Sequence, residues 1–83
     1  MTDMVIAYVL INVRRGCEEE VLERLAAMDE VKEAYLTYSH NIIVEVAAES
    51  IEKVKEVVFW KIRRLENVLS TTTLIVMKEV KDV

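Results

Sequence analysis

The spacing of the apolar residues constrains the fold of this chain most, because it switches between the two-residue period of a strand and the period of about 3.6 residues of a helix. Segments rich in β-branched and aromatic residues predict strands over residues 4–13, 31–38, 41–48 and 68–77. A first helix is predicted over residues 18–28. A second helix is predicted after Ser50, which can cap it, and its apolar stripe comprises Ile51, Val54, Val58, Ile62 and Leu65.

The predicted order of elements, β-α-β-β-α-β, is the ferredoxin-like pattern. It predicts an α+β fold in which a four-stranded antiparallel sheet carries both helices on one face. Ser39 and His40 are predicted to join the second and third strands in a tight hairpin. With 83 residues, one Gly and no Pro, the chain is expected to form one domain, residues 1–83, with short connections and an ordered core over about residues 4–78.

The sheet face that lies away from the helices is also apolar in the sequence. An antiparallel sheet with one wet face should alternate apolar and polar residues, yet both sets in the first strand are apolar. Tyr8, Leu10, Tyr35 and Ile43 are expected on this face, and 53% of the chain is hydrophobic. We therefore predict a homodimer in which two sheets pack face to face, the dimeric α+β barrel. The alternative is that these residues are scattered surface side chains.

Charge and composition exclude several classes of partner. The net charge of −4 disfavours direct binding to nucleic acid. The apolar run over residues 4–11 is too short for a signal peptide or a membrane span. The single cysteine, Cys17, suits a reducing compartment. We expect a cytoplasmic protein with no membrane partner.

Few residues have the pattern of a chemical site. His40 is the only histidine, and no cluster of His, Cys, Asp or Glu has metal-ligand spacing, so we expect no metal, no cofactor and no catalytic residue. The run S-T-T-T over residues 70–73 has two readings. It is either a β-branched strand edge or a row of hydroxyl groups that lines a polar ligand site.

Three segments share a recognisable order and spacing. They are A-Y-V-L-I-N-V at residues 7–13 followed by Arg15, Gly16 and a Glu-rich helix start, V-K-E-A-Y at residues 31–35, and residues 62–76 with Val68 and then T-x-T at Thr71 and Thr73. Together they resemble the Lrp/AsnC family of transcription regulators. The resemblance covers nearly the whole chain, but only the effector-binding half of such regulators, called the RAM domain. Three residues precede the first strand, so we expect a stand-alone form without the helix-turn-helix DNA-binding domain.

The resemblance implies sheet-to-sheet dimers that assemble into rings such as octamers, with an amino acid or related effector bound between dimers. It implies a role in transcription regulation, and a full-length Lrp/AsnC regulator is then an expected partner. Carried over by position, the ligand-binding residues are Tyr38, Ser39, His40, Asn41, Thr71 and Thr73. The family turn T-G-x-Y/F-D differs here: Asn41 stands at the Asp position and offers an ammonium group only a neutral acceptor.

Two alternatives stay open. The chain can be a purely structural oligomerisation module that binds no ligand. It can also be an enzyme of the dimeric α+β barrel type, for which Asn12 and Asn41 are the polar candidates on the sheet face, although neither has an evident base beside it. We expect a ligand-sensing module that is not an enzyme.

Overall fold

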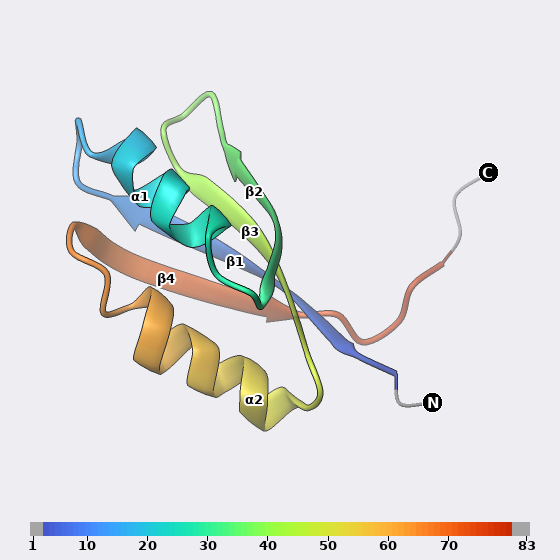
Figure 1. Cartoon of the computed structure of the whole chain (residues 1–83). Helices are drawn as coiled ribbons and strands as arrows, with labels where there is room; N and C mark the ends of the chain where they lie inside the picture. Colours follow the sequence, from blue (N-terminus) through green and yellow to red (C-terminus); the bar gives the residue numbers. More distant parts are fainter. Residues whose placement is uncertain (1–2, 81–83) are drawn as a thin grey trace.

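The computed structural model describes residues 3–80 and confirms the predicted order of elements (Figure 1). Residues 1, 2 and 81–83, which belong to the predicted domain, lie outside the described part. The strands are β1 (Val5–Val13), β2 (Val31–Leu36), β3 (Ile42–Ala48) and β4 (Val68–Ile75). The helices are α1 (Glu18–Ala26), α2 (Ile51–Glu56) and its continuation η1 (Val57–Ile62), a π-helical segment.

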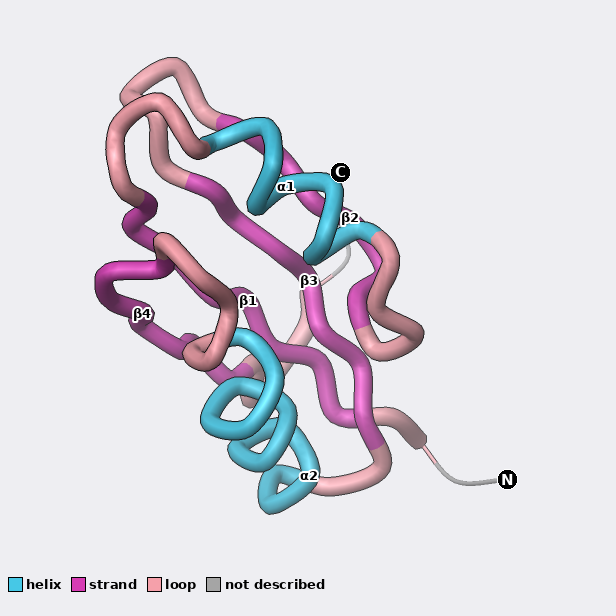
Figure 2. Tube along the Cα trace, turned by 60° about the vertical axis from the view of Figure 1, so that its left-hand side comes forward, coloured by secondary structure: helices cyan, strands magenta, loops and turns pink. Residues whose placement is uncertain are grey.

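The four strands form one antiparallel sheet in the order β2-β3-β1-β4. Both helices lie on the same face of this sheet, as Figures 1 and 2 show from two sides. Helix α1 packs against β2 and β3, and α2 packs against β3 and β1. The other face carries no helix, and residues 76–80 border it beside Tyr8 and Glu45. Strands β2 and β4 are the edge strands.

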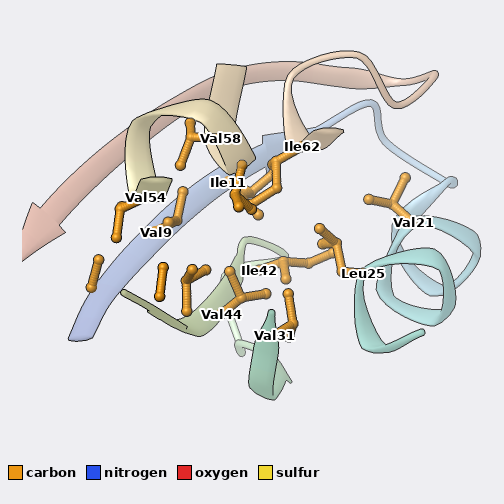
Figure 3. Packing of buried hydrophobic residues seen from close by; sticks show 14 of the residues in the cluster. Val9, Ile11, Val21, Leu25, Val31, Ile42, Val44, Val54, Val58 and Ile62 are labelled. Carbon is orange, nitrogen blue, oxygen red and sulfur yellow. The ribbon is translucent and has the colours of Figure 1, made fainter. Parts of the chain in front are cut away.

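The core fills the space between the helices and the two central strands. Ile11, Leu25, Ile42 and Ile62 are fully buried there, one from each of β1, α1, β3 and η1 (Figure 3). In β1 and β3 alternate residues point into this core, which follows from the two-residue period of a strand. No polar or charged residue among residues 3–80 is buried. Apolar side chains therefore fill the interface between the helices and the sheet.

The second helix departs from the predicted stripe. Ser50 caps it as expected, because its Oγ accepts a hydrogen bond from the N–H of Lys53 at 3.1 Å. The π-helical segment then widens the helix, and the N–H of Arg63 donates to the carbonyl of Val58, five residues earlier. A stripe of period 3.6 fails at Ile51, which is 47% exposed. No helix within residues 3–80 has both the length and the apolar character needed to cross a membrane.

The hairpin between β2 and β3 is longer than the predicted two residues. Strand β2 ends at Leu36 instead of residue 38, and the N–H of Thr37 donates to the carbonyl of Asn41 at 2.8 Å. Three residues, Tyr38, Ser39 and His40, form the loop, and His40 adopts a left-handed conformation with φ of 68°. This is the three-residue type of hairpin loop, whose last residue is left-handed. The two-residue type, which favours glycine, is not formed here.

Replacing Ile62 by Ala should lower the free energy of unfolding by about 3 kcal/mol, because the change leaves a cavity between η1 and β1. The matched control is Ile51→Ala at the exposed helix start, for which we expect a loss below about 1 kcal/mol. Urea unfolding followed by circular dichroism, at one fixed protein concentration, measures both. Equal losses in the two variants would contradict this description of the core.

Candidate functional site

An apolar patch covers the centre of the helix-free sheet face. In the register of the sheet, Tyr35 of β2 lies opposite Ile43 of β3, and Ile43 lies opposite Leu10 of β1. Tyr8 lies one step along β1 and pairs with Leu74 of β4. Tyr8 and Leu10 are each 39% exposed, Tyr35 is 54% exposed and Leu74 is 53% exposed. We call these five residues the open-face patch; the sequence analysis named four of them and missed Leu74.

The open-face patch is negatively charged along one side. Glu33 of β2 lies opposite Glu45 of β3 in the register, an unfavourable pairing of like charges. The Tyr35 hydroxyl lies 3.5 Å from a carboxylate oxygen of Glu33. The negative charge of Glu33 raises the pKa of Tyr35 above its ordinary value. A surface that covers the patch must therefore accommodate acidic groups at this side.

A row of hydrogen-bonded polar side chains crosses the other end of the patch. Asn41 Nδ2 donates to Asn12 Oδ1, and Asn12 Nδ2 donates to Ser70 Oγ at 2.8 Å. Ser39 Oγ donates to Asn41 Oδ1 at 2.9 Å. The row runs from the hairpin over β1 to β4, so the two asparagines are partners of each other. Neither asparagine has an acid or a base among its hydrogen-bond partners within residues 3–80.

The hairpin turn projects from the end of the sheet where β2 is joined to β3. Tyr38 is fully exposed at its tip. His40 Nδ1 lies 3.9 Å from a carboxylate oxygen of Glu18 at the start of α1. The hydroxyl of Thr37 accepts a hydrogen bond from the N–H of Asn41 at 3.1 Å and holds the turn closed. The turn thus presents polar side chains on a defined backbone.

A groove of about 420 Å³ runs along the helix side of β4. It exists because α2 packs over β1 and β3, which leaves this side of the edge strand uncovered. The Arg63 guanidinium lies over the ring of Phe59, 5.6 Å from its centroid. We call this feature the β4 groove. Its lining residues are Lys55, Val58, Phe59 and Arg63 from the helix, and Thr71, Thr73 and Ile75 from the strand.

The six predicted ligand-binding residues fall into two groups. Thr71 and Thr73 line the β4 groove on the helix side of the sheet. The other four lie in the turn that joins the ends of β2 and β3. The side chain of Asn41 also lies on the helix-free face, where it contacts Asn12. A single chain therefore does not bring all six together.

Five of the seven residues that line the β4 groove were not predicted as site residues: Lys55, Val58, Phe59, Arg63 and Ile75. Three of them, Lys55, Phe59 and Arg63, share one side of the second helix. The sequence contains a pattern that could have indicated these three residues. They recur at every fourth position of the second helix, next to its apolar stripe. Two cations and an aromatic ring on one side of a helix indicate that this side is exposed on the surface. Only the position of β4 beside it makes that surface a groove.

Other reactive groups in the described part of the chain form no second site. Cys17 is half-buried against the core, and residues 3–80 contain no group of three His, Cys, Asp or Glu that could hold a metal ion. Trp60 packs edge-on against Phe59 at 4.9 Å between centroids. The Arg64 guanidinium lies over the Trp60 ring at 4.6 Å, outside the β4 groove.

An ion pair ties η1 to the loop before β2. Lys61 Nζ lies 2.7 Å from Glu30 Oε2, and the Glu30 side chain is 20% exposed. This hydrogen bond from Lys61, together with one from the backbone of Glu30, lowers the pKa of the Glu30 carboxyl below its ordinary value of 4.5. The pair helps to hold the segment that carries Phe59 and Arg63 against the rest of the domain.

The chain resembles known proteins over nearly its whole length. The family model described as the Lrp/AsnC ligand binding domain matches residues 6–83. The regulatory protein AsnC of Escherichia coli (strain K12) is 40% identical over 58 residues, which are 69% of this chain and 38% of AsnC. The chain thus matches well under half the length of that curated relative.

Solved structures share the fold. The hypothetical protein PHS023 from Pyrococcus horikoshii is 38% identical with a TM-score of 0.82, over 92% of this chain and 93% of that one. The transcriptional regulator NMB0573 from Neisseria meningitidis, solved as a complex with L-Met, has a TM-score of 0.84 over 94% of this chain and 53% of that one. At 14% identity this second likeness shows the fold alone.

Replacing Lys61 by Met should cost about 0.5 to 1 kcal/mol of unfolding free energy near neutral pH, because the carboxylate of Glu30 loses its partner. The folded pKa of Glu30 is lowered, so the pair stabilises the fold above the ordinary pKa and this contribution is lost as pH falls through the lowered value. Urea titrations of both proteins across the acidic range measure the difference. A deficit that persists undiminished at about pH 2 would contradict the assignment.

Proposed function

This chain belongs to the Lrp/AsnC ligand-binding-domain family, and on that premise we propose that it is a ligand-responsive assembly module. In this proposal it binds an amino acid or a related small effector between dimers. The family is one of transcription regulators and its matched domain is a ligand-binding domain, which disfavours the enzyme alternative. The proposal extends the family assignment to a site and a mode of action.

The β4 groove is the observation that carries the proposal. It combines two threonines, two cationic side chains and an apolar wall in one depression of about 420 Å³. Small-molecule sites are concave and mostly apolar, with a few convergent polar groups, and this groove has that composition. Thr71 and Thr73 are also the two groove residues that the family resemblance implicates. A residue pattern and a surface shape thus support the same site.

The hairpin turn completes the proposed site from a neighbouring dimer. Tyr38, Ser39, His40 and Asn41 lie in the turn between β2 and β3, outside the groove lined by Thr71 and Thr73, so in this proposal a neighbouring subunit supplies them. The same geometry repeats in every copy, because each chain presents both the turn and the groove. Contacts of this head-to-tail kind close into rings when the rotation permits.

The open-face patch supports the dimer from which such a ring is built. Tyr8, Leu10, Tyr35 and Ile43 form a continuous apolar surface together with Leu74. A two-fold axis through the patch would bury it against its own copy, as in sheet-on-sheet packing. The surface that covers the patch in this proposal is the same patch on a second copy of this chain, because every copy exposes the same apolar residues.

The proposed module senses its ligand through assembly. A ligand held between dimers binds the assembled state more tightly than the separated dimers, so it shifts the equilibrium toward the ring by that difference in affinity. A full-length Lrp/AsnC regulator, with the same domain, could join the ring and carry the signal to DNA. A purely structural oligomerisation module would form the same assembly, but no ligand would change its assembly equilibrium.

Leu10→Asp tests the dimer. The substitution places a carboxylate at the centre of the patch, where burial against a second copy would cost several kcal/mol, while the position is 39% exposed in one chain. We expect light scattering at micromolar concentration to give the monomer mass of 9.6 kDa for Leu10→Asp and a multiple of it for the wild type. The control Ile51→Asp, on the helix side, should keep the wild-type mass. A monomeric wild type would refute the dimer.

Isothermal titration tests the ligand. The wild-type assembly is titrated with the standard amino acids and with the 2-oxo acids that correspond to them, and we expect at least one to bind and to change the assembly mass. Thr71→Val removes a groove hydroxyl and should weaken that binding about tenfold. Thr72→Val lies on the opposite face of the same strand, opposite Leu10, and should not weaken the binding as long as light scattering shows the wild-type mass for this variant. Absence of heat with every compound would leave the structural module as the better account.

A further inference from the structure

We propose that the β4 groove selects a small carboxylate with an apolar tail and no ammonium group, which is the chemistry of a 2-oxo acid. This inference rests on the proposed function of the groove and narrows its ligand from amino acids and related effectors to one class. Three features of the groove carry it: its unpaired cations, its apolar wall and its lack of any carboxylate.

The cations of the groove have no acidic partner. Within residues 3–80 neither Lys55 nor Arg63 lies within 4.0 Å of a carboxylate oxygen, and neither donates a side-chain hydrogen bond. In a chain with a net charge of −4, two cations without acidic partners, about two helical turns apart on the helix side of the groove, make the groove a place of local positive charge. Such a place favours an anion, and a guanidinium can hold a carboxylate through two parallel hydrogen bonds.

The remaining walls of the groove suit the rest of such a molecule. Val58, Phe59 and Ile75 form its apolar lining, which can cover a branched or aromatic tail. The hydroxyls of Thr71 and Thr73 lie on the strand side and can donate to a 2-oxo group beside the carboxylate. The groove therefore offers one partner for each part of a 2-oxo acid.

An ammonium group would have no partner of opposite charge here. None of the seven lining residues is acidic, so an amino acid would place its ammonium beside Lys55 and Arg63 with no carboxylate to offset the repulsion. The hairpin turn that is proposed to complete the site adds none, because Asn41 is a neutral amide and already bonds Asn12. Its neighbours Tyr38, Ser39 and His40 are not acidic either.

The test compares two compounds with the same carbon skeleton, 4-methyl-2-oxopentanoate and L-leucine, by isothermal titration into the wild-type assembly. We expect the oxo acid to bind at least about tenfold more tightly than the amino acid. Arg63→Gln should weaken the oxo acid about tenfold through the loss of a charge-assisted hydrogen bond. Arg64→Gln is the matched control, because Arg64 packs on Trp60 outside the groove, and it should bind as the wild type does.

The outcomes separate this inference from the proposed function. L-leucine or another amino acid that binds as tightly as its 2-oxo acid would overturn the inference and leave the ligand-sensing function intact. An oxo acid whose affinity is unchanged in Arg63→Gln binds elsewhere, which also overturns the inference. Failure of every amino acid and every 2-oxo acid to bind would overturn the proposed function together with the inference.

Discussion

The structure depends on one constraint. Both faces of the four-stranded sheet are apolar, but the two helices cover only one of them. The core between β1, β3 and the helices is dry and free of polar side chains within residues 3–80. The opposite face leaves Tyr8, Leu10 and Tyr35 between 39% and 54% exposed. Because a patch of this kind is costly in water, the fold of one chain favours the dimer that we propose.

The same two-layer construction produces the proposed site. Two helices cannot cover four strands completely, and α2 lies over β1 and β3, so β4 keeps a bare strip beside the helix. The π-helical segment places Phe59 and Arg63 along this strip, and Thr71 and Thr73 face it from the strand. π-Helical segments occur often at functional sites, which fits this position. In the proposed function, the groove of one chain and the hairpin turn of another couple ligand binding to assembly.

Local periodicity was enough to predict the element order and the second apolar face, because strand and helix spacings are set by backbone geometry. Periodicity did not predict the features that depend on tertiary packing, which are the buried side of the second helix and the lining of the groove. Val57 is buried beside Val58 in the π-helical segment, and Ile51 at the start of α2 is exposed, a pattern that a regular stripe does not predict. Thr71 and Thr73 came from the family resemblance. Lys55, Phe59 and Arg63 became recognisable as site residues only when the structure placed β4 next to the helix.

Burial of the helix-free face against a second copy is the central claim, and an intermolecular NOE measurement tests it most directly. Isotope-labelled and unlabelled chains are mixed, and only contacts between different subunits are detected. The account predicts signals from the rings of Tyr8 and Tyr35 to the methyl groups of Leu10, Ile43 and Leu74 in the partner. Signals confined to residues of α1 and α2, or none from the five patch residues, would contradict it.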